Sequence, residues 1–283
     1  MGASIITRNF FRRVGFGLRP EQEIPSDPVE WAKSQCISVP KFNWQGEIPS
    51  TKDGLDKLLA YDVTEKSIRK KFKDDIVGLN GAQRAANKSI YTQEKLNLKI
   101  RMNEALFSGS PFFERLLMFW SNHFAIIDKN KLPQLITGPY QREIIRQNLT
   151  GNIEALTREA TISWAMIDAL DNADSVAPNS KKARDLRKRN RVASLNENHA
   201  RELLELHTVS PKARYSQEDV INVAYIMAGW GPGWSNRRKK YKDVSFTHDS
   251  HEPGEHFVLG KGYKQRNVNS KLKLFDLIAD LVR

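Results

Sequence analysis

Residues 195–207 read LNENHARELLELH, and this stretch decides the fold class. Its side chains separate by character when they are placed about 100° apart, the angle between successive residues of an α-helix. Four polar side chains then share one arc: Asn198, Arg201, Glu202 and Glu205. The other side carries Ala200, Leu203 and His207. We therefore predict a helix over residues 194–208 with one polar face.

The helical pattern continues outward over nearly the whole chain. Further helices are predicted over residues 3–14, 28–36, 52–61, 64–77, 84–107, 111–127, 139–149, 151–169, 216–228 and 270–282. Prolines interrupt the pattern in the segments 19–28 and 38–50, which we predict to be loops. Ser216 and Asp219 form a capping pair, because the hydroxyl can accept from a first-turn amide while the carboxylate reaches back. The helix over 216–228 therefore has a well-defined start.

One segment, residues 242–260, has the composition of strands. Residues 244–247 and 256–259 are predicted to pair with each other across the intervening loop. That pairing would place His251 and Glu252 at an exposed tip. We therefore expect a single small hairpin within an otherwise helical chain.

The last predicted helix has an apolar face and an opposite polar side, which carries Lys273, Asp276 and Asp280. Together these patterns predict a mainly α fold, a multi-helix, bundle-like domain with a small β-hairpin near 242–260. We predict one helical domain over 1–283, with a basic loop or insert at 173–193.

The composition excludes several classes of protein and of metal site. The chain has 283 residues, of which 40% are hydrophobic, so it can bury a substantial core. The single cysteine, Cys36, cannot form an intramolecular disulfide or a cysteine-only metal site. No apolar run is long enough to span a membrane, and Arg8, Arg12 and Arg13 interrupt the stretch that a signal peptide needs. A cytoplasmic location is therefore expected for the sequence as written. The sequence also contains no motif for nucleotide binding or serine hydrolysis.

Positive charge is concentrated in two runs. The formal net charge is +12, which favours polyanionic partners in general. Residues 181–191 carry seven cations and one acid, and residues 237–242 carry five cations. Such runs are usually solvated, but they can also contact phosphates. No known nucleic-acid-binding motif accompanies them.

The polar face of the helix over 194–208 admits two interpretations. It can be a solvated surface with an ion pair between Arg201 and Glu205, or a polar network inside a helix bundle. A divalent metal is a candidate cofactor, but His207 lies five residues after Glu202, unlike the Glu-x-x-His spacing of bundle metal sites. One helix cannot easily supply both ligands, so an imidazole from His123 or His251 would be needed. His123 falls on an apolar stripe of its own helix, where a satisfied core histidine is the commoner case.

Seven motifs resemble, in order along nearly the whole chain, the bacterial family called domain of unknown function 1800. They are RRVGFG (12–17), FWSNHF (119–124), LDN (170–172), NENHARELLELHT (196–208), YSQEDV (215–220), AGW (228–230) and HEPGEHFVLGKGY (251–263). The family has no established activity to carry over. The resemblance implies that its polar signature positions include Asn122, Asn196, Asn198 and Trp230, which we assign as candidate substrate-binding residues. His199 and His256 fall outside the signature.

The resemblance also implies features beyond this chain. Relatives look longer and often exported, so this chain resembles a C-terminally truncated or split member. They are often encoded beside a second family, domain of unknown function 1501, which makes a protein of that type a candidate partner. The oligomeric state is not indicated.

Three functions remain open at the level of sequence. An enzyme would use Glu202 and Glu205 as bases or ligands, with Arg201 holding an anionic or sugar-like substrate. Its imidazoles would come from His123, His207 and His251, with His123, His207 and Glu202 as the candidate metal set. A non-catalytic scaffold would use the same polar residues as a buried hydrogen-bond network. A polyanion-binding or nucleic-acid-binding protein would use the runs 181–191 and 237–242.

Overall fold

The computed structural model describes residues 5–20, 23–127, 130–235, 240–264 and 271–283. Its described residues are mainly helical with two small antiparallel sheets, which confirms the predicted fold class. Backbone contacts divide the chain into two compact units. Unit 1 comprises residues 1–125 and 130–152, and unit 2 comprises residues 126–129 and 153–283. The prediction of one domain over 1–283 stays a prediction.

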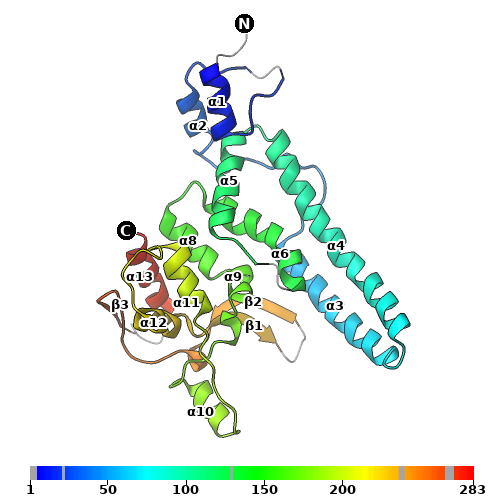
Figure 1. Cartoon of the computed structure of the whole chain (residues 1–283), viewed down its shortest axis with the longest axis vertical. Coiled ribbons are helices and arrows are strands. Elements are labelled where there is room, and N and C mark those ends of the chain that lie inside the picture. The colour runs from blue at the N-terminus through cyan, green and yellow to red at the C-terminus, as the bar shows by residue number, and fades with distance from the viewer. Residues whose placement is uncertain (1–4, 21–22, 128–129, 236–239, 265–270) are drawn as a thin grey trace. The chain divides into compact units, whose positions relative to one another are not determined.

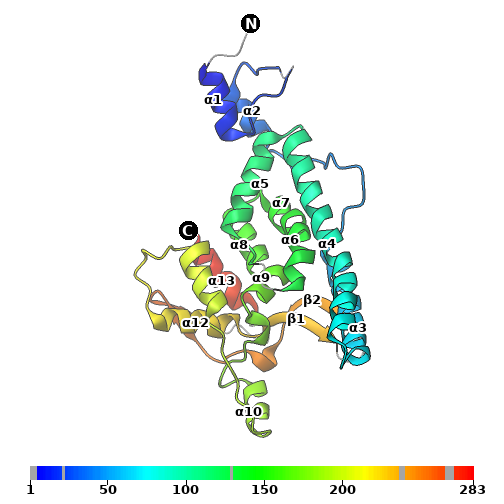
Figure 2. The same cartoon turned by 45° about the vertical axis from the view of Figure 1, so that its right-hand side comes forward.

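Unit 1 is built around a long helical hairpin, formed by α3 (Thr51–Lys71) and α4 (Ile76–Phe107) (Figure 1). The other elements of unit 1 are α1 (Ile5–Val14), α2 (Pro28–Ser34), α5 (Pro111–His123), α6 (Lys131–Tyr140), the π-helical turn η1 (Gln141–Ile145) and α7 (Arg146–Asn148). Helix α3 replaces the two helices predicted over 52–61 and 64–77, because no helix-breaking residue separates them. A capping box between Ser50 and Asp53 starts α3, and α6 packs against both hairpin helices (Figure 2).

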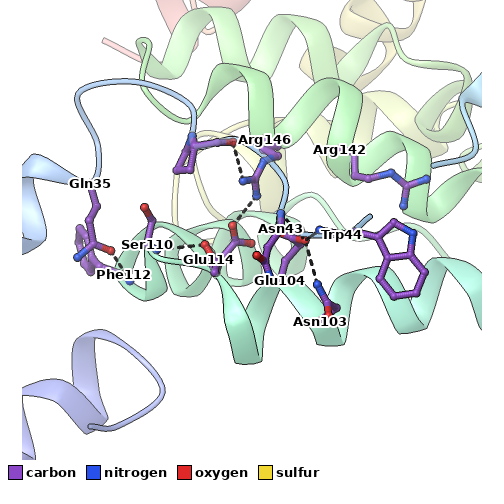
Figure 3. A network of polar contacts seen from close by, with 12 residues as sticks. Gln35, Asn43, Trp44, Asn103, Glu104, Ser110, Phe112, Glu114, Arg142 and Arg146 are labelled. Atoms are coloured by element: carbon purple, nitrogen blue, oxygen red, sulfur yellow. Dashed lines mark hydrogen bonds and ion pairs between the residues drawn. The ribbon is translucent and has the colours of Figure 1, made fainter. Parts of the chain in front are cut away.

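A buried polar network fastens the predicted loop over 38–50 to the helices of unit 1 (Figure 3). Arg146 Nη1 lies 2.6 Å from Glu114 Oε1, and both side chains are almost fully buried. The other arm of Arg146 donates to the carbonyl of Pro40 at 3.0 Å. Glu104 accepts from the backbone amides of Asn43 and Trp44. The loop is thereby held by the buried side chains of Arg146 and Glu104.

Unit 2 packs helices around a fully apolar centre. Its helices are α8 (Ile153–Thr161), α9 (Trp164–Ala169), α10 (Lys181–Arg187), α11 (Asn198–Glu202), α12 (Gln217–Met227) and α13 (Lys271–Leu281). Short turns are η2 (Asn172–Asp174), the π-helical η3 (Leu203–His207) and η4 (His248–Ser250). Helix α12 lies against α11, α13 and the strand β3. Val220, Val223 and Leu277 are completely buried in this core.

Several helix boundaries differ from the predicted ones for local reasons. The helix predicted over 151–169 is divided into α8 and α9, because Ser163 caps a new helix by accepting from the amide of Met166. The helix predicted over 194–208 begins at Asn198 and ends in the π-helical turn η3. The basic segment 173–193 is not only a loop, since it contains α10. Among the described helices, none combines the length and the apolar character needed to cross a membrane.

Two hairpins replace the single one predicted near 242–260. Strand β1 (Trp230–Ser235) pairs antiparallel with β2 (Lys240–Phe246), and β3 (His256–Val258) pairs antiparallel with β4 (Lys261–Tyr263). The predicted pairing of 244–247 with 256–259 is therefore wrong. Leu259 and Gly260, with φ values of 49° and 79°, form a two-residue turn that returns the chain directly onto β4.

The expected exposed tip at residues 251–252 is also wrong. His251 is 4% exposed and Glu252 is 5% exposed, because the segment folds inward against the residues around α10 and α12. The backbone amide of Ala177 donates to the carbonyl of Ser250, and that of Thr247 donates to the carbonyl of Gly229. These bonds hold the segment on both sides.

Candidate functional site

The predicted polar arc of α11 lies at the surface of unit 2 as a network of exposed ion pairs. Arg201 lies 3.3 Å from Glu205 and 3.5 Å from Glu197, and it donates to Gln217 at 2.8 Å. Hydrogen bonds from Tyr215 and then Arg201 lower the pKa of Glu205. Such half-exposed pairs contribute little to the free energy of folding.

The remaining residues predicted on this segment have identifiable positions. Partial burial, followed by the nearby Glu205 charge, raises the pKa of Glu202. Asn198 is exposed, and its backbone amide donates to the side chain of Asn196 at 2.8 Å. Asn196 therefore helps to begin α11. Among the residues of the arc, Glu202 is the one whose surroundings most oppose ionisation.

The opposite side of this segment carries two buried histidines. His207, at 7% exposed, lies at the end of the π-helical turn, as the apolar side of the predicted helix requires. His199 is completely buried, and neither of its ring nitrogens has a hydrogen-bond partner among the described residues. Burial, and then the neighbouring His207, lower the pKa of His199 to about 3. Both rings are therefore part of the apolar core, although His199 lies outside the sequence signature.

The predicted metal set is distributed between the two units. His123 lies in α5 of unit 1, where its ring meets those of Trp120 and Phe124 edge-on, while Glu202 and His207 lie in unit 2. Asn122, a predicted substrate-binding residue, is exposed in unit 1. In the part of the chain that the structure describes, no three His, Cys, Asp or Glu side chains are arranged to hold a metal ion. The metal set stays a prediction.

Unit 2 contains a second group of polar side chains that is buried. We call it the buried His–Lys cluster and define it as His251, Glu252, His256 and Lys273. Three members come from the HEPGEH motif before β3, and Lys273 comes from α13. All four are at most 6% exposed. Four ionisable groups at this depth form an electrostatically coupled site.

His251 is held in one tautomer. Its Nδ1 lies 2.9 Å from the carbonyl oxygen of Ala228, and because a carbonyl only accepts, Nδ1 carries the proton. The other nitrogen, Nε2, is then an unprotonated acceptor, and it has no hydrogen-bond partner among the described residues. Burial, together with the nearby charge of Lys273, lowers the pKa of His251 to about 4, although the hydrogen bond to Ala228 opposes this shift. The ring is therefore neutral at pH 7.

Lys273 is the cation of the cluster. Its Nζ donates to the carbonyl of Gly254 at 2.8 Å, which leaves further N–H donors on the same ammonium group. Burial lowers the pKa of Lys273 to about 8, while Glu252 opposes this shift. The sequence pattern places Lys273 on the polar side of the last helix, and in the structure that side is covered at this residue, which is 2% exposed. Packing of the HEPGEH segment against α13 covers it.

The remaining two members are oriented by backbone contacts. Glu252 accepts from the backbone amide of Asn179 at 3.0 Å and also from its side-chain amide. His256 Nε2 lies 3.4 Å from the backbone carbonyl of Glu252. Burial and then Lys273 lower the pKa of His256. Glu252 is therefore held in place by the segment before α10.

The backbone around Ala228 is shaped to admit His251. Gly229 has a φ of 103°, and a Cβ there would lie 2.5 Å from the carbonyl oxygen of Thr247. The side-chain amide of Asn172 donates to the carbonyls of Met227 and Trp230 and so fixes both sides of this turn. A residue other than glycine at 229 would push the turn away from the histidine.

Trp230, predicted to bind substrate, forms part of the wall of this region. It is 5% exposed and packs against the rings of Phe246 and Phe275. The sequence analysis selected His251 but missed Glu252, His256, Lys273 and Asn179. The available signal was the spacing H-E-x-x-E-H together with a lysine between leucines in the last helix.

The cluster combines an unprotonated imidazole nitrogen, Nε2 of His251, which can accept a hydrogen bond, with an ammonium group, Nζ of Lys273, which can donate further ones. No curated protein and no solved structure matches the chain significantly. A family model described as a protein of unknown function, DUF1800, matches residues 9–282. The chain therefore belongs to the DUF1800 family, as its sequence motifs indicate.

Proposed function

We propose that unit 2 carries an acid–base catalytic site in which His251 is the general base. The observation that carries this proposal is the buried Nε2 of His251, which is unprotonated and has no described partner. Leaving a buried acceptor without a hydrogen bond costs about 1–3 kcal/mol. His199 also lacks described partners, but only His251 is fixed in one tautomer by a backbone carbonyl, which leaves Nε2 as a defined acceptor.

The proposed step moves one proton. Nε2 of His251 takes the proton from a hydroxyl group of water or substrate, and the oxygen becomes a stronger nucleophile. The ammonium of Lys273 donates to that oxygen and stabilises the negative charge that develops on it. The bond to Ala228 keeps the ring in the tautomer that this step needs.

An anionic substrate fits this site better than a neutral one. The pKa of free His251 is about 4, which makes it a weak base at pH 7. A negative charge bound beside the ring stabilises the imidazolium and raises that pKa toward the working pH. Binding of an anionic substrate thereby makes His251 a stronger base.

The substitution His251→Asn tests this proposal. The asparagine side-chain amide can still donate to the carbonyl of Ala228, but it lacks the base at the position of Nε2. We expect wild-type protein to turn over at least one of a panel of chromogenic esters and acidic glycosides. We expect His251→Asn to lose this activity while its melting temperature stays close to that of wild type. The rate should be highest between about pH 4 and pH 8, where the imidazole is neutral and Lys273 is charged.

A structural role for the cluster is the second candidate. It is favoured by the backbone hydrogen bonds of His251, Glu252 and Lys273, which join the HEPGEH segment to three other parts of unit 2. A purely structural cluster predicts that His251→Asn and wild type behave alike in every activity assay, and that Lys273→Met lowers stability. Such a result would overturn the catalytic proposal.

A further inference from the structure

The segment 180–191 of unit 2 presents an ordered array of positive charge. Seven cations are exposed along it, with Asp185 as the one acid: Lys181, Lys182, Arg184, Arg187, Lys188, Arg189 and Arg191. Asp185 lies 3.5 Å from Lys188, and Lys181 lies 3.3 Å from Asp249. The other five cations have no carboxylate partner among the described residues. Figures 1 and 2 both show α10 projecting from the rest of unit 2.

This segment is held in place, unlike a solvated charge run. Ser180 is 2% exposed and caps α10 by accepting from the amide of Ala183, which is fully buried. Arg184 and Arg187 each donate to a carbonyl of the residues just before the helix, at 2.7 and 3.2 Å. The side chains of the segment are therefore already ordered in the folded protein. Their conformational entropy is not lost again when a ligand binds, which increases the affinity for that ligand.

Stability of the helix does not account for these charges. Lys181 and Lys182 lie in the first turn of α10, where no acid is present and where positive charge opposes the helix dipole. Repulsion among seven neighbouring cations adds a further cost. An anionic partner would remove both penalties at once.

The array is directly connected to the buried His–Lys cluster. Asn179 immediately precedes Ser180, and both its backbone and its side chain donate to Glu252. Lys181 pairs with Asp249, two residues before His251. The basic segment and the HEPGEH segment are therefore neighbours in unit 2.

We infer that segment 180–191 binds an acidic polysaccharide beside the HEPGEH segment of unit 2, an inference that rests on the proposed function. Such a polymer carries hydroxyl groups, which the site accepts, and anionic groups, which the segment attracts, in each repeating unit. Guanidinium groups match carboxylates by paired hydrogen bonds. Residues 165–214 contain no Phe, Trp or Tyr that could stack on the bases of a single-stranded nucleic acid.

Binding of a fluorescent oligogalacturonate to the whole chain tests this inference separately from catalysis. The variant Lys182→Gln/Arg189→Gln/Arg191→Gln removes three cations that have no described ion pair. We expect its affinity to fall by about tenfold or more and its salt dependence to weaken. The matched control, Lys66→Gln/Lys70→Gln/Lys73→Gln, removes the same charge from exposed positions in unit 1 and should bind as wild type does.

Two further arms separate the possible failures. The variant His251→Asn should bind the oligogalacturonate within about twofold of wild type, because it keeps the basic segment intact. If it binds normally and turnover is also unchanged, the proposed function fails while the binding inference stands. Equal losses in the two triple variants would show an effect of net charge alone and overturn the inference. Tighter binding of a duplex or single-stranded DNA of the same charge would also overturn it, in favour of a nucleic acid.

Discussion

The two units treat buried charge in opposite ways. In unit 1, Arg146 meets Glu114 at 2.6 Å, stacks over the ring of Phe42 and donates to Pro40. In unit 2, Lys273 has no described ion pair within hydrogen-bond distance, and His251 keeps an acceptor without a described partner. The first arrangement matches charge with charge and fastens a loop. The second leaves a buried cation without a described ion pair beside histidines whose pKa values are lowered, a combination that is common at ligand sites.

The largest expected effect comes from breaking the matched pair of unit 1. Arg146→Met should lower the free energy of unfolding by about 3–5 kcal/mol, because Glu114 would remain buried without its cation. Urea unfolding followed by circular dichroism measures this loss. The double variant Arg146→Met/Glu114→Gln should recover part of it, since no lone charge remains. A loss below about 1 kcal/mol in the single variant would show that the pair contributes no more than a surface ion pair.

A smaller loss of stability is expected when the buried histidines of unit 2 are brought to acidic pH. In the folded chain the pKa of His199 is lowered to about 3 and the pKa of His251 to about 4. In the unfolded chain both histidines have a pKa of about 6.5. Between these values the unfolded chain binds more protons than the folded chain, so stability falls as the pH drops from 6.5 to 4. For His199 alone the loss is about 3 kcal/mol.

The variant His199→Phe sharpens this measurement. As the pH falls across that range, the melting temperature of wild type should drop more steeply than that of the variant, because phenylalanine has no proton to bind. Parallel curves would mean that His199 is charged or solvated in the folded chain. His251→Asn, measured in the same way, reports the second histidine.

The smallest expected effect comes from Lys273→Met. The folded pKa of Lys273 is about 8 and its unfolded pKa is near 10.5, so wild-type stability should rise with pH between these values. At pH 7 the variant should differ from wild type by less than about 2 kcal/mol, since removing a buried cation is offset by the loss of its attraction to the buried Glu252. Chemical denaturation at pH 7 and pH 10 measures both effects. A larger destabilisation at pH 7 would favour the structural role for the cluster.

Much of the fold follows from short-range patterns in the sequence. The capping box of Ser216 and Asp219 is present as predicted, with bonds of 3.1 and 2.7 Å. The polar arc around Arg201 is on the surface, and Leu203 and His207 are buried, as the helical spacing indicates. These features depend on residues within one or two turns of one another. The run at 237–242 was predicted to bind polyanions, and its side chains lie outside the described residues.

The candidate site could be predicted only in part. His251 was selected from sequence, but its burial and its tautomer depend on Ala228, which lies 23 residues away along the chain. The burial of Lys273 could not be predicted, because a helical wheel separates polar from apolar residues and does not show what covers them. The importance of Glu252 becomes visible only through Asn179, 73 residues earlier.

By itself the sequence determined the helical class, the positions of most helices, the family and the places where charge accumulates. Helical periodicity, capping and net charge are local or additive properties, so they can be predicted from the amino-acid sequence alone. Tertiary structure decided which hairpins form, which histidine keeps an unused acceptor and which lysine is buried. These outcomes depend on burial and on hydrogen bonds between distant segments, whose free energies arise only when the segments pack together.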